Sequence, residues 1–370
     1  MKIAIIGTRG IPNHYGGFEQ YASLLAVYLV QNGWDVTVYN SSTHPYKETV
    51  YQGVKIRHAY DPEPFLKTFG QFIYDFNCIM QLRKEKYDII YQLGYTSSAV
   101  FQFLLPRKSI IVSNMDGLEW KRSKYSPLVR KYLKYAEKLV ATKSDYLIAD
   151  AIPIQEYLFK EYQKEALYSA YTVDVPDHFD DSILQTLNLL PQSYDLVIAR
   201  IQKDNNIEMI IQGFLQANTG QRKLVVVGNM QTGFGKYLMQ KYTSEKIVFP
   251  GSLYDIPKLF ALRRHAYVYF HGHSAGGTNP SLLEAMATSC RIMAHDNVFN
   301  RSVLKENALF FSQPEELAAL LNNIDEYAHF FEGAIRENIR QIQTQYTPHH
   351  VFGGLEKHFL SWIAAHKHHA

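Results

Sequence analysis

Short apolar segments alternate with helical segments along almost the whole chain, and this alternation limits the possible folds more than any other feature. Strands that alternate with helices form parallel sheets covered by helices on both faces. The sequence therefore predicts an α/β protein with two successive doubly wound domains. The predicted strands of the first series lie at 2–6, 35–39, 54–58, 88–92, 109–113 and 146–149, with helical stretches at 64–84, 96–105 and 127–143. Those of the second series lie at 194–199, 223–228, 247–249, 266–270, 291–294 and 308–311.

The length of the chain and a polar internal stretch indicate its domain organisation. A chain of 370 residues is long enough for about two domains, each with its own core. Residues 175–192 are rich in proline and aspartate and read as a connection. We expect an N-terminal domain over 1–180, a C-terminal domain over 181–345, and a helical segment over 346–370 that packs back toward the N-terminal domain.

Composition narrows the class of protein. Hydrophobic residues make up 46% of the chain and charged residues 20%, as in ordinary globular proteins. The two cysteines, Cys78 and Cys290, lie far apart in apolar surroundings, which favours a reducing compartment over a disulfide. The sequence shows neither a signal-peptide pattern nor a run of 18 apolar residues. We therefore expect a cytoplasmic protein.

Residues 271–287 predict an anion site. This stretch follows an apolar strand, turns on two glycines and begins a helix. Asn279 fits the N-cap position and Pro280 the first helical position, because proline has no N–H to lose. We expect the N–H groups of Ser281 and Leu282 to be free and to face the turn. Such donors, together with the positive end of the helix dipole, favour a phosphate.

Glu284 lies one turn further into the same predicted helix. A carboxylate there can accept hydrogen bonds from the vicinal hydroxyls of a ribose. One short segment would then hold the diphosphate and the sugar of a nucleotide. Taken alone, the pattern fits equally well an ordinary Gly-Gly turn followed by a solvated glutamate.

A second glycine-rich loop follows the first predicted strand. Gly-Thr-Arg-Gly-Ile-Pro occupies 7–12, and Tyr-Gly-Gly-Phe-Glu at 15–19 leads into a helical pattern. The glycines lack the dinucleotide-binding spacing, and the second strand ends in Asn40 rather than in a carboxylate, which argues against an NAD site. The loop instead allows the backbone to approach a ligand, with Arg9 as a phosphate partner.

Charged residues follow three other predicted strands, at the edge where doubly wound sheets bind their ligands. Asp116 precedes a glycine after the strand that ends near residue 113, and Asp150 follows the strand that ends near 149. An Asx turn or cap is the alternative for Asp116, and a helix cap is the simpler explanation of Asp150. Arg200 ends the first strand of the second series, where its bidentate fork suits a diphosphate.

Residues 120–143 carry eight lysines and arginines against one acid, Glu137. Tyr125, Tyr132 and Tyr135 are interleaved with these charges. A basic helix with interfacial aromatic residues is attracted to an anionic membrane surface. A solvated basic face is the alternative. Nucleic acid is disfavoured as a partner because no known binding motif accompanies the charge.

These features together resemble the GT-B glycosyltransferases, in which two Rossmann-like domains face a central cleft. More narrowly, the sequence resembles the bacterial rhamnosyltransferase branch of glycosyltransferase family 4. Members of that branch carry Gly-Thr-Arg-Gly-Ile-Pro, Tyr-Gly-Gly-Phe-Glu and Asp-Gly-Leu-Glu-Trp-Lys-Arg in the N-terminal domain. All three motifs occur here, at 7–12, 15–19 and 116–122. The likeness covers nearly the full length of the chain.

The resemblance implies roles for the matching residues. Glu284 would bind the nucleotide ribose, and Arg200 would neutralise the diphosphate as a catalytic group. Asp116 would stand near the anomeric carbon, and Asp150 shares the catalytic assignment. The other donor-site residues would be Gly16, Gly17, His273, Gly277, Thr278, Asn279 and Ser281, and the acceptor-side residues would be Arg9, Glu19 and Tyr95.

Two positions depart from the pattern of the broader family. The glutamate that usually lies eight residues before the ribose-binding glutamate is Gly276 here, and the usual Lys-Gly after the arginine is Asn205-Asn206. Both departures occur in the rhamnosyltransferase branch, and both fit a deoxysugar donor, which offers fewer hydroxyls. His273 and Ser274 are the candidates to replace the missing glutamate.

The sequence thus predicts a retaining glycosyltransferase that needs neither a metal nor a cofactor. It would move L-rhamnose from dTDP-L-rhamnose to a saccharide on a lipid diphosphate, in cell-surface polysaccharide synthesis at the inner face of the cytoplasmic membrane. Two alternatives stay open: a GT-B sugar-nucleotide epimerase, and a non-catalytic protein that binds a sugar nucleotide or a polysaccharide.

Overall fold

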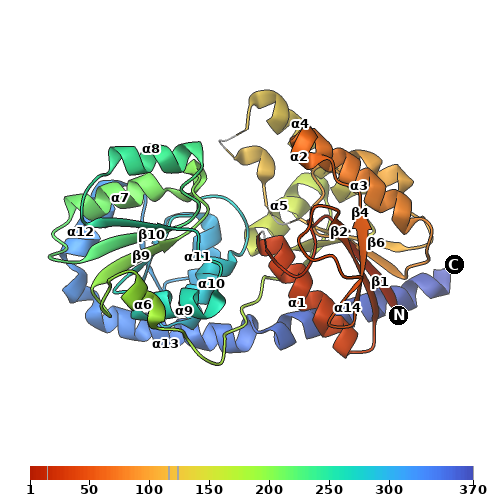
Figure 1. Cartoon of the computed structure of the whole chain (residues 1–370). Coiled ribbons are helices and arrows are strands. Elements are labelled where there is room, and N and C mark those ends of the chain that lie inside the picture. The colour runs from red at the N-terminus through yellow and green to blue at the C-terminus, as the bar shows by residue number, and fades with distance from the viewer. Residues whose placement is uncertain (15, 116, 123–124, 370) are drawn as a thin grey trace. The chain divides into compact units, whose positions relative to one another are not determined.

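The structure, a computed structural model, describes residues 1–14, 16–115, 117–122 and 125–369 and consists of two compact units (Figure 1). Unit 1 comprises Met1–Trp120, Tyr125–Thr172 and Pro348–Ala370. Unit 2 comprises Lys121–Lys124 and Val173–Thr347. Each unit is built around its own sheet, so both predicted α/β series are present.

Unit 1 contains an eight-stranded sheet with the order β3-β4-β2-β1-β5-β6-β7-β8. Neighbouring strands are parallel, except that β3 runs antiparallel to β4. Two short strands, β3 and β8, were not expected, because two or three residues are too few to show a periodic pattern. The strands are β1 (Lys2–Ile6), β2 (Asp35–Ser41), β3 (Val50–Tyr51), β4 (Val54–Ala59), β5 (Ile89–Gln92), β6 (Ile110–Asn114), β7 (Tyr146–Ala149) and β8 (Ala166–Tyr168).

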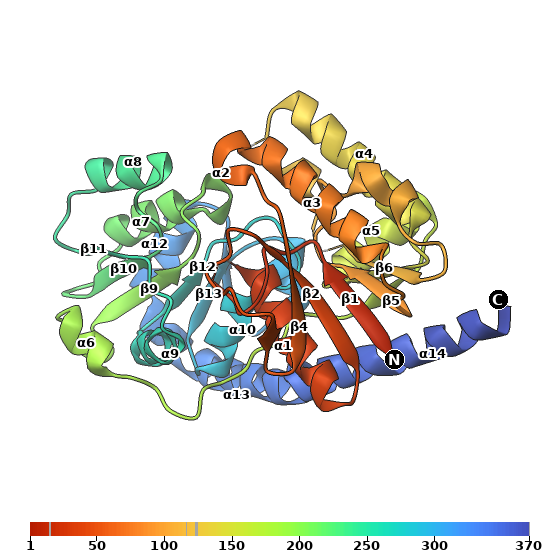
Figure 2. The same cartoon turned by 45° about the vertical axis from the view of Figure 1, so that its right-hand side comes forward.

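The helices of unit 1 cover this sheet, and the last helix of the chain, α14, lies here against α1 and β6 (Figure 2). The segment predicted as a helix over 96–105 forms instead a 3-10 helix, η1. The helices are α1 (Gly17–Gln31), α2 (Glu63–Leu66), α3 (Thr68–Leu82), η1 (Ala99–Leu104), η2 (Glu119–Lys121), α4 (Pro127–Lys143), α5 (Ile152–Tyr162) and α14 (Pro348–His369).

Unit 2 contains a six-stranded parallel sheet with the order β11-β10-β9-β12-β13-β14. Its strands are β9 (Tyr194–Ile198), β10 (Lys223–Val227), β11 (Ile247–Gly251), β12 (Tyr269–His271), β13 (Ile292–His295) and β14 (Leu309–Phe311). Its helices are α6 (Ser182–Thr186), η3 (Lys203–Asn205), α7 (Ile207–Gln216), α8 (Gly233–Lys241), α9 (Ile256–His265), α10 (Pro280–Ala287), α11 (Val298–Leu304), α12 (Pro314–Asn322), η4 (Ile324–Tyr327) and α13 (Ala328–Gln345).

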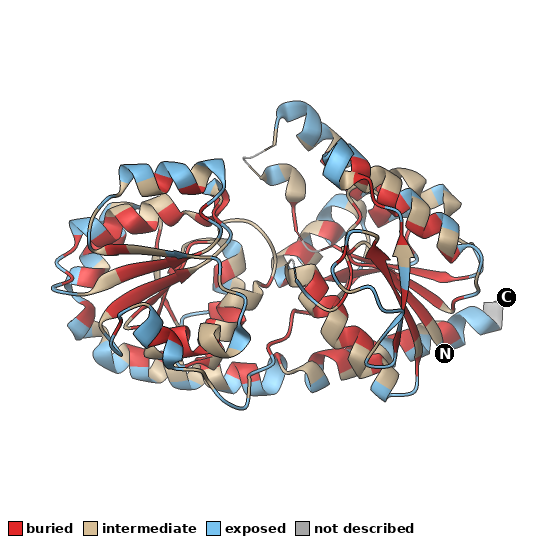
Figure 3. Ribbon diagram, in the orientation of Figure 1, coloured by how far each residue is buried: buried red, intermediate tan, exposed pale blue. Residues whose placement is uncertain are grey.

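The central strands of both units are buried along their length (Figure 3). In unit 2, helices α7, α8 and α12 lie on one face of the sheet, and α9, α10 and α13 lie on the other (Figures 1 and 2). A parallel strand covered on both faces needs apolar residues at every position rather than at every second one. The sequences Lys-Ile-Ala-Ile-Ile of β1 and Lys-Leu-Val-Val-Val of β10 have this character.

The strand order reverses beside the first strand of each sheet. In unit 1 the chain goes from β1 to β2 on one side and later returns to β5 on the other. In unit 2 it goes from β9 to β10 on one side and returns to β12 on the other. Loops leave such a point in opposite directions, so ligands of doubly wound sheets bind there, beyond the carboxyl ends of the strands.

The loops at the reversal in unit 1 approach each other very closely at Gly7. A Cβ atom on Gly7 would lie 2.2 Å from the carbonyl oxygen of Gly94, and Gly7 has a φ of +80°. Gly33 has nearly the same φ, +82°, but no atom lies within 4 Å of the position that its Cβ would take.

The comparison of these two glycines yields a test of the packing at the reversal. We expect Gly33→Ala to lower the free energy of unfolding by about 1 kcal/mol, because only the left-handed backbone disfavours alanine. Gly7→Ala should lower it by a further 1–3 kcal/mol or so, because the loop after β5 must move. Urea unfolding of both variants measures the difference. Equal losses would show that the loop after β5 yields without strain.

Candidate functional site

The strand reversal in unit 2 brings Arg200 and the loop after β12 to one edge of the sheet. Arg200 follows β9 and is exposed to solvent. The loop at 272–279 follows β12, the direct neighbour of β9 in the sheet. Both segments were predicted as parts of one site, and the sheet order places them beside each other.

Two asparagines fix the backbone of these segments. The Asn205 Nδ2 donates to the carbonyl of Arg200 (2.7 Å), and the Asn206 Nδ2 donates to the carbonyl of Gly272 (2.9 Å). A Cβ atom on Gly272 would lie 2.2 Å from the carbonyl oxygen of Asn205, so only glycine allows this close passage. The Asn205-Asn206 pair therefore links the loop after β9 to the loop after β12.

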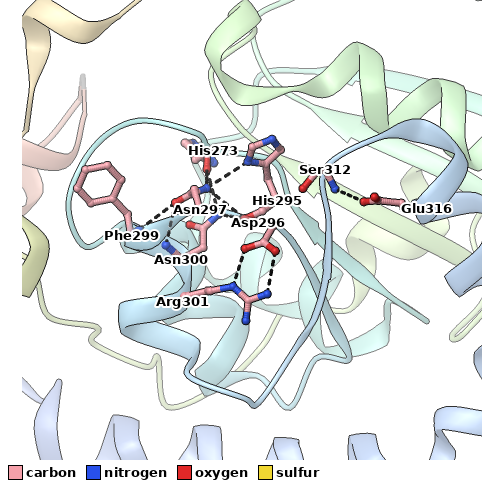
Figure 4. Close-up of polar contacts among 9 residues, drawn as sticks. All are labelled: His273, His295, Asp296, Asn297, Phe299, Asn300, Arg301, Ser312 and Glu316. Atoms are coloured by element: carbon pink, nitrogen blue, oxygen red, sulfur yellow. Dashed lines mark hydrogen bonds and ion pairs between the residues drawn. The ribbon is translucent and has the colours of Figure 1, made fainter.

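A second pair of asparagines holds the same loop from α11 (Figure 4). The side-chain amides of Asn297 and Asn300 both donate to the carbonyl of His273, each at 3.0 Å. Asn297 is also the N-cap residue of α11, since its Oδ1 accepts from the N–H groups of Phe299 and Asn300. The position of His273 is thus set by the start of a neighbouring helix.

His273 stacks on His271, with ring centroids 4.4 Å apart and ring planes 14° apart. Burial lowers the pKa of His273 to about 3, and the positive charges of Arg200 and Arg122 contribute. Burial also lowers the pKa of His271 well below its ordinary value. Both imidazoles are therefore neutral near pH 7, and a neutral imidazole offers one hydrogen-bond donor and one acceptor.

At the start of α10, the predicted N-cap residue is confirmed, but the N–H groups that were expected to be free are not. Asn279 is the N-cap residue and Pro280 the first helical residue, as predicted. The N–H of Ser281, however, donates to the Asn279 Oδ1 (3.0 Å), and the N–H of Leu282 donates to the Asn279 carbonyl (3.0 Å). The expectation that both N–H groups are free is wrong, because the cap residue itself satisfies them.

Glu284 forms an ion pair with Arg263, a residue that the sequence did not single out. The Arg263 side chain is 1% exposed and that of Glu284 is 15% exposed. The Arg263 Nη2 also donates to the Ser281 Oγ (3.1 Å), which lies 2.6 Å from the hydroxyl of Tyr269. Burial raises the pKa of Tyr269 to about 12, so this hydroxyl keeps its proton. The hydroxyl of Ser281 is thus part of an internal network.

Arg263 escaped prediction because it begins a basic stretch, Arg-Arg-His, at the end of α9. Cations near a helix C-terminus are common and are usually solvated. The adjacent Arg264 is exposed in this way. Periodicity offered one signal: Arg263 follows the buried Phe260 by three residues and so lies on the same face of the helix.

In unit 1 the glycine-rich loop after β1 is held by Asn40. The Asn40 Nδ2 donates to the carbonyl of Ile11 (2.7 Å), and its Oδ1 accepts from the N–H of Ile11 (3.0 Å). The absence of a carboxylate at this strand end, noted in the sequence, thus has a structural use. The N–H of Arg9 donates to the Oε1 of Glu19 (2.9 Å), whose side chain is buried.

The other acceptor-side and glycine positions of unit 1 lie around the same loop. The Arg9 guanidinium forms a bidentate ion pair with Glu63 in α2. Burial opposes ionisation of Glu63, but hydrogen bonds from Arg9 and Gln71 lower its pKa overall. Gly16 is the N-cap residue of α1 and has extended backbone, and Gly17 begins that helix. Tyr95 is buried directly after the loop that meets Gly7.

Of the two candidate catalytic aspartates, only Asp150 lies in the described part of the chain. Asp116 lies outside the described residues. Asp150 is buried after β7. Helix α5 begins at Ile152 with Ala151 as its N-cap residue, so Asp150 is not the cap that the alternative explanation required.

The basic segment divides into a buried and an exposed part. Glu137 is buried and accepts hydrogen bonds from Trp120 (3.1 Å), Tyr162 (2.6 Å) and Tyr157. The ammonium of Lys134 lies 3.1 Å from the Glu137 Oε1. The sequence counts Lys134 among the charges of a basic surface, but in the structure this cation compensates a buried carboxylate.

Tyr132, also expected at an interface, donates its hydroxyl to the carbonyl of Thr96 (2.7 Å) and faces inward.

Four exposed residues of α4 form a stripe, which we call the α4 face: Leu128, Lys131, Tyr135 and Lys138. Spacings of three, four and three residues place these side chains on one side of the helix. Leu128 is 80% exposed and Tyr135 55%. Among the described residues, no helix is long and apolar enough to span a bilayer.

Family models match both units of the chain. Residues 188–330 match the family described as Glycosyl transferases group 1. Residues 1–174 match a family described as a domain of unknown function, DUF1972. Unit 2 thus carries a glycosyltransferase group 1 domain. No curated protein matches the chain.

Solved structures share the fold of the whole chain. Sucrose-phosphate synthase from Thermosynechococcus elongatus is 17% identical, with a TM-score of 0.80 over 98% of this chain and 99% of that one. HepE from Anabaena, in complex with UDP and glucose, is 16% identical, with a TM-score of 0.73 over 98% and 100%. A glycosyltransferase from Rickettsia africae is 12% identical, with a TM-score of 0.71 over 97% of each chain. These likenesses confirm the predicted GT-B fold.

The stacked histidines yield a prediction about protonation. We expect the ring of His273 to stay neutral from about pH 4 to pH 8, whereas the same ring in the unfolded chain titrates near its ordinary value of 6.5. The unfolded state then binds more protons between about pH 3 and 6.5, so stability falls as the pH falls through this range.

Histidine ring signals in NMR spectra, assigned with His273→Gln, test this directly. The His273→Gln variant should also lose less stability than the wild type between pH 6.5 and 4.5. A His273 signal with a midpoint near 6.5 would contradict the prediction.

Proposed function

We propose that this glycosyltransferase binds its nucleotide-sugar donor in unit 2, at the loops that follow β9 and β12, and that the donor is dTDP-L-rhamnose. One observation carries the proposal: a single edge of the sheet combines an exposed arginine, a helix N-terminus and a partly exposed carboxylate one turn into that helix. The arginine and the helix N-terminus can bind a diphosphate, and the carboxylate can accept a hydrogen bond from a ribose hydroxyl.

Arg200 and the backbone at 277–279 are assigned to the diphosphate. The N–H groups of Ser281 and Leu282 are already bonded to Asn279, so the donors for an anion come from the loop before the cap. When the bond from the sugar C1 to the β-phosphate oxygen breaks, negative charge develops on the leaving diphosphate. A guanidinium and a helix dipole at this edge of the sheet stabilise that charge.

The transfer itself conserves the configuration at C1 in this proposal. The C1 atom forms a bond to an acceptor hydroxyl oxygen, and the proton of that hydroxyl passes to the leaving diphosphate. Asp116 and Asp150 remain the proposed polar groups near the reacting centre. No metal and no cofactor takes part, since arginine and helix end supply the positive charge.

His273 is proposed to take the place of the glutamate that the broader family has at Gly276. Its ring is neutral near pH 7, so it can exchange a hydrogen bond with a sugar hydroxyl without adding charge. Ser274, the other candidate, already donates its hydroxyl to the carbonyl of Asp204 (2.7 Å). Because the Ser274 hydroxyl is already bonded, His273 is the better candidate for the contact with the sugar.

The acceptor is proposed to be a saccharide on a lipid diphosphate, used in cell-surface polysaccharide synthesis. Arg9, Glu19 and Tyr95 form the proposed acceptor side of unit 1. The α4 face combines apolar and basic side chains, and such a combination binds to anionic membrane surfaces. Lys131 and Lys138 also line a cavity of about 350 Å³ with Glu161 and Tyr162. These features support the proposal that the enzyme acts at the inner face of the cytoplasmic membrane.

Two other functions compete with this proposal. A sugar-nucleotide epimerase needs the same donor site, but it has no use for a membrane-binding face, and the analysis of products distinguishes it. A non-catalytic binding protein would bind the nucleotide and transfer nothing. The complex of HepE with UDP and glucose supports a nucleotide-sugar ligand in general and does not favour rhamnose.

Thermal unfolding with nucleotides tests the donor site. With EDTA present, we expect dTDP to raise the unfolding midpoint more than UDP or GDP. At 100 times its Kd a ligand contributes about 2.7 kcal/mol to the stability of the folded state. Glu284→Gln, which keeps an acceptor for Arg263, should remove about half of this shift, because a tenfold weaker Kd leaves about 1.4 kcal/mol. Glu284→Ala is less suitable, because an uncompensated buried charge costs about 3–5 kcal/mol.

The matched control is Glu315→Gln, the same chemical change at an exposed position of α12. It should leave the shift with dTDP intact. A larger shift with UDP or GDP would replace rhamnose by another donor sugar. No shift with any of the three nucleotides would overturn the donor site.

Sedimentation with vesicles tests the α4 face. We expect Lys131→Glu combined with Lys138→Glu to lower binding to phosphatidylglycerol-containing vesicles about tenfold or more, because each basic residue near an anionic surface contributes about 1 kcal/mol. The control combines Lys236→Glu on α8 with Lys357→Glu on α14, both exposed, and changes the net charge equally. If both double variants lost vesicle binding equally, the attraction to the vesicles would depend on the net charge of the protein and not on the α4 face.

A further inference from the structure

We propose that Arg263 is a positioning residue that holds Glu284 in the orientation in which its carboxylate binds the nucleotide ribose. This inference rests on the proposed function, because it concerns the same donor site. It adds a residue that does not itself touch the ligand, and it makes the discrimination of ribose hydroxyls depend on a buried charge in α9.

The contacts of Arg263 join three elements of unit 2. Arg263 lies in the last turn of α9, Ser281 and Glu284 lie in α10, and Tyr269 lies in β12. The Arg263 Nη2 donates to both the Ser281 Oγ and the Glu284 Oε2. Tyr269 and Ser281 are themselves bonded to each other at 2.6 Å, so the Ser281 oxygen that accepts from the guanidinium is itself held in place.

Stability alone does not account for an arginine at this position. The side chain is 1% exposed, and removing a guanidinium from water costs several kcal/mol that one carboxylate repays only in part. Apolar side chains of similar volume are often neutral or stabilising in such places. The favourable interaction with the C-terminus of α9 does not need it either, because the exposed Arg264 supplies a cation there.

The effect of the contact falls on Glu284. A glutamate in a helix has three side-chain torsions and, when exposed, samples several rotamers. The ion pair commits the Oε2 to Arg263, while the side chain keeps 15% of its surface accessible. A carboxylate accepts hydrogen bonds at both oxygens, so the oxygen not bonded to Arg263 is available to a hydroxyl. The ordering is completed before the ligand arrives, which lowers the entropic cost of binding.

This arrangement predicts which ligands lose affinity when Arg263 is replaced. A nucleotide with ribose hydroxyls uses Glu284, whereas the analogue without them does not. The ratio of the two dissociation constants therefore reports the orientation of Glu284. A general loss of packing would weaken both ligands alike and leave the ratio unchanged.

The experiment measures Kd by calorimetry for dTDP and for its 3′-deoxy analogue, and for UDP and its 2′,3′-dideoxy analogue. We consider whichever of the two nucleotides, dTDP or UDP, binds the wild type more tightly. Its Kd should be about tenfold lower than that of its deoxy analogue, because a hydrogen bond to a charged group contributes about 1.5 kcal/mol. In Arg263→Met this ratio should fall below about threefold. Arg263→Lys, which keeps the charge but loses the fork, should give an intermediate ratio.

Arg222→Met is the matched control. Arg222 forms another buried ion pair of unit 2, with Asp195 at 3.1 Å, and Asp195 is fully buried. This variant should lose stability and keep the wild-type ratio.

An unchanged ratio in Arg263→Met overturns the proposal, and where that variant does not fold, an unchanged ratio in Arg263→Lys does so. A wild-type ratio near one overturns the ribose contact of Glu284, and the inference with it, but leaves nucleotide binding intact. Failure of the wild type to bind any nucleotide overturns the proposed function itself.

Discussion

The reversal of strand order beside β1 and beside β9 is the constraint on which both candidate sites depend. Parallel strands are joined by right-handed crossovers, so a change in direction along the sheet sends successive loops apart at the carboxyl ends of the strands. The backbone must then pass very near itself. Gly7 against Gly94 in unit 1 and Gly272 against Asn205 in unit 2 are the contacts that a Cβ atom would obstruct.

Neutral amides bind several backbone groups of the loops around these reversals. Asn40 in unit 1 binds both the N–H and the carbonyl of Ile11. Asn206 and Asn300 bind the carbonyls of the loop after β12 in unit 2. An amide satisfies a buried backbone group at a lower desolvation cost than an ion does. The buried Arg263 is a contrast to this pattern, and its position next to Glu284 is consistent with use in binding rather than in folding.

The basic segment shows how one run of charge serves two purposes. Lys134 sits over the rings of Trp120, Tyr157 and Tyr162, at 4.8, 4.8 and 5.1 Å from their centroids, and compensates the buried Glu137. The α4 face keeps its basic and apolar side chains in solvent. Helical periodicity separates the two sets, because residues three or four apart share a side of the helix. Net charge along the sequence therefore overstates the charge that an external partner meets.

The sequence by itself determined the α/β class, most of the strand positions, and the Asn279 cap with Pro280 at the start of α10, because periodicity and capping are local properties. It also marked Arg200, His273 and Glu284, because each follows a strand or a glycine turn in a recognisable motif. Only the tertiary structure decided that Arg263 binds Glu284, that Lys134 is committed to Glu137, and that the N–H groups of Ser281 and Leu282 are occupied. The first depends on which elements pack together. Lys134 and Glu137 lie three residues apart in α4, but the burial of Glu137 depends on the elements that pack against it. The third depends on the Asn279 rotamer for Ser281 and on the backbone of the first turn for Leu282. A linear pattern does not contain such information, because it fixes the face of an element but not the neighbour that the face meets.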